Sequence, residues 1–331
     1  MSNRRLNEST DFLVIGAGLA GLAFARQMTE QGASVRLLDK GGVVGGRAAT
    51  RRFGTTVVDH GAQFFTARSP EFQAIVEKGL SEGWIRTWYR SIPEWRDGTL
   101  HARPDGHSRY ACPEGITVLP KFLARGLEIV TEAEVIALSR EDKGYRAETK
   151  DGRAFVGATL ILNLLPVQLL NLASELIAPE AAERIGRVSL EPCWALLAQL
   201  ENDLAVEWPA LELTEHPVFS WIARDHTKRP PGTSPTLIAH AAAAWTRAHL
   251  EASQAEIEHL LRAALEELLG PLTLTQSQTH HWRYAKPETS FGESFFWDGT
   301  RRIGACGDWC AGGRVEGAFL SGLRLGQEVQ L

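Results

Sequence analysis

The stretch DFLVIGAGLAGLAFARQMTEQGASVRLLDK, residues 11–40, decides the fold. Residues 12–15 form a short apolar run, which is typical of a buried parallel strand. A helix is expected to follow as far as about Glu30, and Gly32 ends it before a second apolar run, SVRLLD. The order strand, helix, strand predicts a βαβ unit and a parallel sheet.

Three glycines between the first strand and the helix fit the binding of a dinucleotide. Gly16 allows a tight turn, Gly18 lets the backbone approach a pyrophosphate, and Gly21 lets the helix pack closely on the strand. The diphosphate would lie on the N–H groups at the positive end of the helix dipole. Asp39 follows Gly16 by 23 residues and is placed to accept hydrogen bonds from ribose hydroxyls. This pattern predicts an adenine dinucleotide site without separating NAD from FAD.

The residues that follow the second strand favour FAD. The loop GGVVGGRAATRR carries Arg47 directly after Gly45 and Gly46. A flexible turn that brings a guanidinium to a diphosphate can form paired, charge-assisted hydrogen bonds. The loop resembles the GG-Arg motif of FAD-dependent amine oxidases and their relatives, in which the arginine lies along the cofactor diphosphate.

Longer segments resemble one branch of that superfamily, the bacterial renalases. VVDHGAQFFTAR, residues 57–68, is similar to the renalase segment D-x-G-A-Q-[YF]-[FI]-T, and similar segments follow in order as far as CGDWCAGGRVEGAFLSG, residues 306–322. The loop ACPEGITVLPKFL, residues 111–123, departs from the pattern. Ile116 replaces the methionine of the relatives, and Pro120 is expected to interrupt a helix there. This loop is expected to form one wall of the substrate pocket.

The resemblance implies an α/β fold: a Rossmann-type FAD-binding domain with an inserted α+β substrate domain, as in amine oxidases and p-hydroxybenzoate hydroxylase. We assign residues 10–67, 119–170 and 296–331 to the FAD-binding domain. Residues 68–118 and 171–295 are assigned to the substrate domain. FAD would lie extended between the two domains, with its ring at their interface.

The motifs and the resemblance together imply the residues that bind FAD. In the resembling family the Gly-Asp pair near the C-terminus contacts the ribityl-diphosphate side of FAD, and the next helix begins near the flavin N1–C2 edge. A helix N-terminus would stabilise the negative charge of reduced flavin there. The predicted cofactor-binding residues are Gly16, Ala17, Gly18, Leu19, Ala20, Gly21, Asp39, Lys40, Gly46, Arg47, Gly61, Ala62, Gln63, Phe64, Val135, Gly307, Asp308, Trp309, Arg314, Val315 and Glu316.

Four main candidates and one weaker one are expected to take part in the chemistry at the flavin ring. Because a flavin carries the redox chemistry itself, the protein must bind it, orient the substrate and tune its electronics. Gln63 belongs to the family segment that runs beside the flavin, and His240 corresponds to a pocket histidine of renalases. Trp282 and Tyr284 would supply a flat surface and a hydroxyl, and Trp221 is a weaker candidate. Core packing is the alternative role for His240 and for each of these aromatic residues.

Cys306 and Cys310 flank a Gly-Asp-Trp tripeptide and raise the question of a redox or metal site. Their Cys-x-x-x-Cys spacing differs from the redox Cys-x-x-Cys motif, and no second pair completes a metal site. His280-His281 likewise lacks a matching cluster of cysteines or carboxylates. We therefore expect both cysteines to be bystanders, and no bound metal.

Composition and charge narrow the class of protein. The 331 residues include 44% hydrophobic and 23% charged ones, with a net charge of −5. This balance predicts a globular protein that binds neither nucleic acid nor an anionic membrane. Four scattered cysteines favour the cytoplasm. Arg4-Arg5 before an apolar run is typical of an export signal, but Asp11 in front of that run argues against one.

The resemblance implies an activity, and two alternatives stay open. Renalases oxidise a 2- or 6-dihydro isomer of NAD(P), pass a hydride to flavin N5 and then reduce O2 to H2O2. No side-chain base would be required. The first alternative is a flavin amine oxidase or desaturase of the same superfamily, which would hold its substrate in an aromatic cage. The second is a non-catalytic protein that binds FAD or another nucleotide. The sequence does not predict the oligomeric state.

Overall fold

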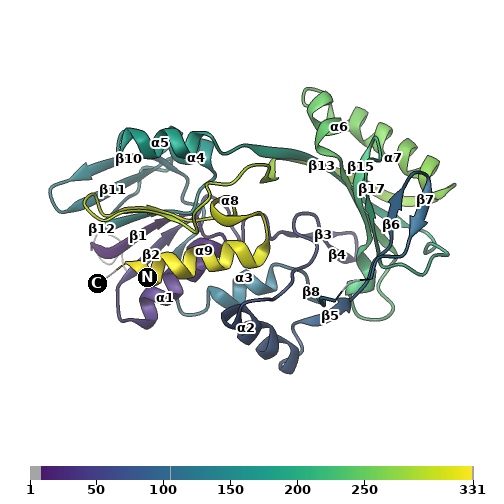
Figure 1. The fold of residues 1–331 in the computed structure, drawn as a ribbon, viewed down its shortest axis with the longest axis horizontal. Coiled ribbons are helices and arrows are strands. Elements are labelled where there is room, and N and C mark those ends of the chain that lie inside the picture. Colours follow the sequence, from purple (N-terminus) through teal and green to yellow (C-terminus); the bar gives the residue numbers. More distant parts are fainter. Residues whose placement is uncertain (1–8, 105, 330–331) are drawn as a thin grey trace. The chain divides into compact units, whose positions relative to one another are not determined.

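The computed structural model describes residues 9–104 and 106–329, in which two units are each assembled from separate stretches of the chain (Figure 1). Unit 1 contains the described residues up to Ala48, then Leu119–Leu190, and those from Lys286 onward. Unit 2 contains Ala49–Val118 and Glu191–Ala285. The Arg4-Arg5 pair that is typical of an export signal lies outside the described residues.

Unit 1 is built on a sheet with the order β10-β11-β12-β1-β2-β9, in which β19 also pairs with β12 and β18 with β19. Its central strands β19, β12, β1, β2 and β9 run parallel. The strands are β1 (Thr10–Ile15), β2 (Val35–Leu38), β9 (Glu128–Val130), β10 (Val135–Glu141), β11 (Gly144–Thr149), β12 (Ala154–Leu162), β18 (Phe296–Asp298) and β19 (Ile303–Ala305). β1, near the centre of this sheet, is almost wholly buried, as its unbroken apolar run predicts.

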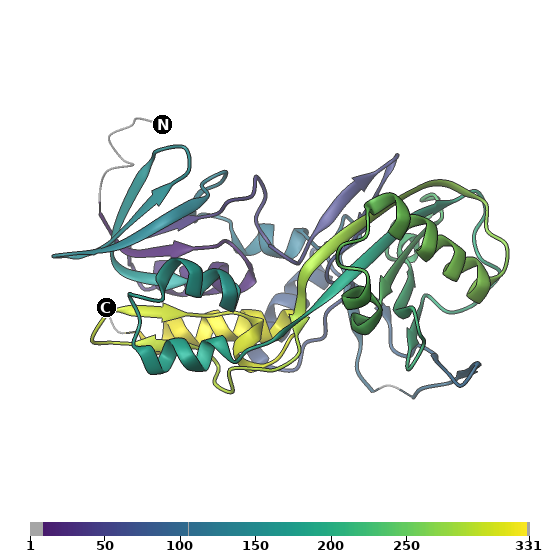
Figure 2. The same ribbon diagram turned by 90° about the horizontal axis from the view of Figure 1, so that it is seen from above.

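The helices of unit 1 include two that are far apart in sequence and packed together. α1 follows β1, and α9 lies against it (Figures 1 and 2). A Cβ atom at Gly322 of α9 would collide with the carbonyl oxygen of Ala20 of α1, so the close approach requires glycine. The helices are α1 (Leu19–Glu30), α3 (Val118–Leu123, which starts at the unit boundary), α4 (Pro166–Ala173), α5 (Pro179–Gly186), α8 (Asp308–Ala311) and α9 (Val315–Glu328).

The predicted βαβ unit is confirmed. β1 and β2 pair in parallel, α1 connects them, and the helix ends at Glu30. Gly32 has a φ angle of +91°, which favours glycine at this turn. The predicted α/β fold class is also confirmed, whereas the exact boundaries of the FAD-binding and substrate domains stay predictions.

The expectation that Pro120 interrupts a helix is wrong. α3 forms with Pro120 in its first turn. The amides of a first turn have no acceptor within the helix, so the missing N–H of proline costs nothing there. The preceding turn is tight, because Gly115 has a φ of +105° and a Cβ atom there would meet the Thr50 hydroxyl at 2.5 Å.

Unit 2 is built on a sheet with the order β17-β13-β16-β15-β14-β6-β7. Two hairpin-like pairs, β3–β4 and β5–β8, and the helices α2, α6 and α7 complete it. The strands are β3 (Thr50–Phe53), β4 (Thr56–Asp59), β5 (Arg86–Tyr89), β6 (Glu94–Arg96), β7 (Thr99–His101), β8 (Arg109–Ala111), β13 (Leu190–Leu200), β14 (Ala210–Leu213), β15 (Phe219–Arg224), β16 (Thr236–Ala241) and β17 (Leu274–Pro287), and the helices are α2 (Pro70–Ser81), the 3₁₀ helix η1 (Asp225–Lys228), α6 (Ala243–Ala248) and α7 (Gln254–Leu269).

The two faces of the unit 2 sheet differ. Ile257, Leu261 and Leu265 of α7 pack against one face, in a core of aliphatic and aromatic side chains. The opposite face packs against Phe53 and Val58 of the β3–β4 hairpin. Because side chains alternate along a strand, the strand side chains that point toward Phe53 and Val58 all lie on one surface of the sheet. We call this surface the aromatic face. Its partly buried aromatic members are Phe64, Trp221 and Trp282.

Among the described residues, no helix combines the length and the apolar character needed to cross a membrane.

Candidate functional site

The glycine loop between β1 and α1 forms a cradle of backbone in unit 1. α1 starts after Gly18 without a side-chain cap and with no acidic residue in its first turn. A Cβ atom at Gly16 would collide with the carbonyl oxygen of Asn163, and one at Gly21 with the carbonyl oxygen of Gly16. Gly16 also has a φ of +100°. A helix N-terminus approached by bare backbone fits a diphosphate, as the sequence predicts.

Asp39 links the glycine loop to the end of β2 by hydrogen bonds. Its Oδ2 accepts a hydrogen bond of 2.6 Å from the amide of Ala17, and its Oδ1 accepts one of 2.7 Å from Gly41. A carboxylate has about four acceptor positions, so two remain for ribose hydroxyls. Lys40 is exposed, and Val135 packs on the core of unit 1. The ribose contact stays a prediction, and the structure adds a role for Asp39 in holding the glycine loop.

The two motifs farthest apart in sequence meet in unit 1. Arg47 Nη2 lies 2.5 Å from Asp308 Oδ1, and both side chains are partly exposed. The loop that carries Arg47 lies beside the glycine loop, because the amide of Gly45 donates to the carbonyl of Ala17 at 2.9 Å. The predicted diphosphate residues are therefore brought together, and a guanidinium with five N–H donors can serve Asp308 and a phosphate at once.

Some other predicted cofactor-binding residues near the C-terminus are buried. Trp309 is only 1% exposed, donates its indole N–H to the carbonyl of Leu164 at 2.9 Å and packs on Phe291. This geometry favours a packing role for Trp309 over a flavin contact. The amide of Gly307 donates to the hydroxyl of Ser321 at 3.0 Å, which fixes the turn before Asp308.

The start of α9 carries the remaining predicted cofactor residues. Arg314 is the exposed N-cap residue, and Val315 begins the helix. Glu316 is 3% exposed and lies in the first turn. A carboxyl side chain at this position itself complements the positive end of the helix dipole. A contact of this helix end with flavin stays a prediction.

Cys306 and Cys310 have the properties of inert core thiols. Both are buried. Burial raises the pKa of Cys306 well above its ordinary value and raises that of Cys310 to about 12. Because the thiolate is the reactive form, neither residue is poised for redox chemistry at neutral pH.

We expect Cys306 and Cys310 to resist alkylation in the folded protein. Brief treatment with iodoacetamide near pH 8, followed by peptide mass spectrometry, should label the half-buried Cys193 first and the other two only after unfolding in urea. Labelling of Cys306 in the native protein at the rate of Cys193 would contradict this assignment.

Several predicted substrate-site residues share the aromatic face of unit 2. Trp221 of β15 is directly opposite His240 of β16, which is opposite Ala195 of β13. Phe64 packs on Trp221 with a ring-centroid distance of 5.4 Å, and Trp282 joins the same core. Four of the predicted side chains therefore gather on one surface, and each is only partly buried.

Two histidines complete this surface: His60, which no sequence pattern indicated, and His280, which the sequence suggested only as a possible metal ligand. The His60 ring stacks on Trp282 at 5.3 Å and meets His280 edge-on at 4.8 Å. The Trp282 indole donates to the carbonyl of His60 at 2.8 Å. His280, Trp282 and Tyr284 alternate along β17, so they point to the same side of that strand. The alternation of these three residues can be recognised in the sequence, whereas the contact of His60 with Trp282 cannot.

Burial keeps these two histidines neutral. It lowers the pKa of His60 to about 3, with help from His280 and Arg51. It lowers the pKa of His280 to about 4, again with help from Arg51. Near neutral pH both rings are therefore uncharged, can accept hydrogen bonds and are weak bases.

Gln63 is used in holding its own loop. Its Nε2 donates to the carbonyls of Asp59 at 2.5 Å and Gly61 at 3.1 Å, and its Oε1 accepts from Lys228 Nζ at 3.1 Å. The side chain is buried, whereas Ala62 and Gly61 are partly exposed. These contacts favour a positioning role for Gln63, with Phe64 as the neighbour that reaches the aromatic face.

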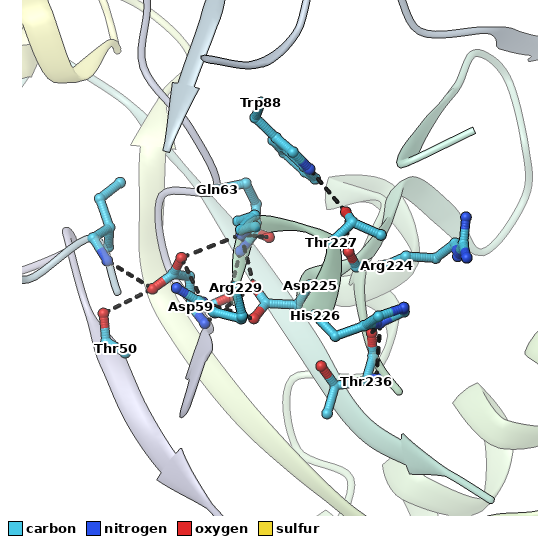
Figure 3. A network of polar contacts seen from close by, with 12 residues as sticks. Thr50, Asp59, Gln63, Trp88, Arg224, Asp225, His226, Thr227, Arg229 and Thr236 are labelled. Carbon is cyan, nitrogen blue, oxygen red and sulfur yellow. Dashed lines mark hydrogen bonds and ion pairs between the residues drawn. The ribbon is translucent and has the colours of Figure 1, made fainter. Parts of the chain in front are cut away.

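A buried ionic network fixes this loop (Figure 3). Asp59, Asp225, Lys228 and Arg229 have side chains that are at most 1% exposed. Lys228 Nζ lies 2.6 Å from Asp225 and 3.2 Å from Asp59, while Arg229 lies 2.6 Å and 2.8 Å from the same two carboxylates. Two positive and two negative charges thus cancel inside unit 2.

The Asp59 carboxylate has further donors, from the Thr50 hydroxyl at 2.7 Å and the Ile116 amide at 2.8 Å. Burial alone would raise the pKa of Asp59, but Lys228 and Arg229 hold it below its ordinary value. This network was not predicted from the sequence. Its only signal was the group of charges in WIARDHTKRPP within an otherwise apolar region.

Two family models match the chain. A model of NAD(P)-binding Rossmann-like domains matches residues 14–78, and a model of flavin containing amine oxidoreductases matches residues 98–330. The second match covers well over half of the chain.

Individual proteins that are similar to this chain are named as oxidases. "Putative flavin-containing monoamine oxidase AofH" of Mycobacterium tuberculosis is 34% identical over 89 residues, which are 27% of this chain and 20% of that protein. The chain thus spans about a fifth of the length of these curated relatives. Cyclohexylamine oxidase from Brevibacterium oxydans IH-35A has a similar fold, with a TM-score of 0.75 and 14% identity over 97% of this chain and 98% of that one. Putrescine oxidase bound to putrescine gives a TM-score of 0.74 at 14% identity, over 97% and 99% of the two chains.

Proposed function

Because the chain belongs to the family of flavin containing amine oxidoreductases, we propose that it is an FAD-dependent oxidoreductase whose substrate is a 2- or 6-dihydro isomer of NAD(P). The observation that carries the choice of substrate is the pair of neutral histidines beside Trp282. With pKa values of about 3 and 4, His60 and His280 are uncharged near neutral pH, so an amine substrate would have to lose its proton to water before binding here. A dihydronicotinamide gives up a hydride without losing a proton to a base.

The residues of unit 1 supply the cofactor site in this proposal. The N-terminus of α1 and Arg47 hold the FAD diphosphate, and Asp39 accepts from the adenosine ribose. When bound, FAD would supply the hydride acceptor, and its two electrons would then reduce O2, with two protons, to H2O2. A cytoplasmic location, which the cysteine content favours, is part of the same proposal.

The aromatic face supplies the substrate surface. The rings of Trp282, Trp221 and Phe64 offer flat apolar area for a nicotinamide, and His240 offers a polar group in register with Trp221. Their contribution is orientation, since a ring held flat can present one carbon for hydride transfer.

Amine oxidation is the second candidate, supported by the names of the relatives above. The centre of the Phe64 ring lies 5.9 Å from that of Tyr89 and 5.4 Å from that of Trp221, and such a group of rings could surround an amine. Binding of FAD without turnover is the remaining alternative. It would leave the polar groups of the aromatic face without a role in catalysis.

Anaerobic stopped-flow absorbance separates these functions. Mixing the purified holoenzyme with a chromatographically separated 2- or 6-dihydro isomer of NADH should bleach the bound flavin rapidly, while ordinary NADH should be slow or inert. Readmitted O2 should restore the colour and yield about one H2O2 per substrate oxidised. Bleaching by amines alone would replace the proposal with amine oxidation. No bleaching by either class would favour a binding protein.

A further inference from the structure

Arg51 lies at one edge of the aromatic face. It is opposite Val58 in the β3–β4 hairpin and two residues before Phe53, so the three side chains share the hairpin side that packs on the sheet. Arg51 Nη2 lies 3.3 Å from His280 Nδ1, and the His280 ring lies 4.4 Å from Trp282. The guanidinium is half-buried and is separated from Trp282 by one imidazole ring.

The contact with His280 does not neutralise Arg51. His280 is uncharged near neutral pH, so its Nδ1 accepts a hydrogen bond and contributes no negative charge. A carboxylate partner would cancel the charge of the guanidinium, but an imidazole only orients it. The side chain therefore keeps a full positive charge at the edge of an apolar surface.

The other charges around the aromatic face add to this positive character. The Arg109 guanidinium carbon lies 5.7 Å from the centre of the Phe64 ring and 5.9 Å from that of Tyr89. Three carboxylates of unit 2 are paired with other cations, and Glu191 lies on the same side of β13 as Ala195. Asp59 and Asp225 are balanced in the buried network described above, and Glu212 lies 2.7 Å from Arg103. Beside Arg51, whose printed partner is an uncharged imidazole, an anionic ligand would be attracted.

We propose that Arg51 is a substrate-specificity residue that binds a phosphate group of the dinucleotide substrate, while the reacting ring lies against Trp282. This inference rests on the function proposed above and adds the residue that selects a phosphorylated substrate. One guanidinium nitrogen faces His280, and the planar fork of an arginine can still offer two parallel N–H donors to a phosphate. His280 acts as a positioning residue for that fork.

The test compares two substrates with the same reacting ring. One is the active dihydro isomer of NADH, and the other is the matching dihydronicotinamide riboside, which has no phosphate. Arg51→Gln should raise KM for the dinucleotide roughly 10- to 100-fold, the usual cost of a lost charged hydrogen bond. It should leave kcat, and KM for the riboside, within about twofold.

Arg52→Gln is the matched control, because Arg52 is the next residue, is exposed and points to the other side of the hairpin. It should leave both KM values unchanged. Arg51→Lys keeps the charge without the planar fork and should give an intermediate KM. Thermal melting of each holoenzyme shows whether the fold is intact, and Arg51→Lys carries the test if Arg51→Gln does not fold.

The outcomes separate this inference from the proposed function. An equal rise in KM for dinucleotide and riboside would overturn the role of Arg51 and leave the dihydronicotinamide activity standing. If the wild-type enzyme oxidises neither substrate, the proposed function fails. In that case inorganic pyrophosphate, titrated into the holoenzyme while flavin absorbance is followed, tests the anion site directly. Binding that Arg51→Gln abolishes would support the site, and identical binding by both proteins would overturn it.

Discussion

Replacing Gly16 with alanine is expected to remove FAD binding. The new Cβ atom would collide with the carbonyl oxygen of Asn163, which is backbone and cannot rotate away, and Gly16 has a φ of +100° that alanine rarely adopts. Backbone strain of this kind costs about 1–3 kcal/mol before the collision is added. We expect Kd for FAD to rise at least about 100-fold, which corresponds to roughly 3 kcal/mol. Isothermal titration of the apoprotein with FAD measures this.

Gly32→Ala is the control for backbone strain alone. Gly32 follows the other end of α1 and has a φ of +91°, but a Cβ atom there would have no neighbour within 4 Å. This variant should lose some stability and keep its affinity for FAD. Normal FAD binding by Gly16→Ala would mean that the glycine loop is not the diphosphate cradle.

Replacing Lys228 with methionine is expected to destabilise the protein by about 3–5 kcal/mol. The change leaves the two carboxylates of Asp59 and Asp225 with only Arg229 as a buried counter-charge. The Gln63 amide also loses the donor to its oxygen. Urea unfolding followed by circular dichroism gives the free energy of unfolding, and a loss below about 1 kcal/mol would show that the network contributes little.

A charge-balanced double variant separates the charge from the packing. In Asp225→Asn with Lys228→Met, one carboxylate and the ammonium are removed together, and Asp59 still faces Arg229 at 2.8 Å. We expect this protein to lose clearly less stability than the sum of the two single variants, because neighbouring charges do not contribute additively. Strict additivity would mean that the charges act independently.

Local patterns in the sequence were sufficient for part of the fold. The βαβ unit at residues 10–38 follows from an apolar run, a glycine turn and a helical segment that Gly32 ends, all within the span of one supersecondary structure. The wrong prediction that Pro120 interrupts a helix also has a local cause. Proline breaks a helix in its interior, but Pro120 lies in the first turn, where proline is tolerated.

The substrate site depends on contacts that no local pattern encodes. His60 stacks on Trp282 across more than two hundred positions, and Asp59 meets Lys228 across 169. Such pairs form only when the sheet of unit 2 and its hairpin are assembled. Sequence resemblance indicated Trp282 and His240 because of the residues around them, but it could not identify the neutral histidines or the guanidinium beside them.

The chain passes from one unit to the other four times, at residues 48, 118, 190 and 285. This connectivity has a consequence for biosynthesis. α1 is made among the first thirty residues, yet its packing partner α9 is completed only at Glu328. Unit 1 therefore cannot reach its full set of elements until the residues up to Glu328 have left the ribosome. The glycine loop is thus made long before the helix that packs behind it, and we expect tight FAD binding to follow the closure of these long-range contacts.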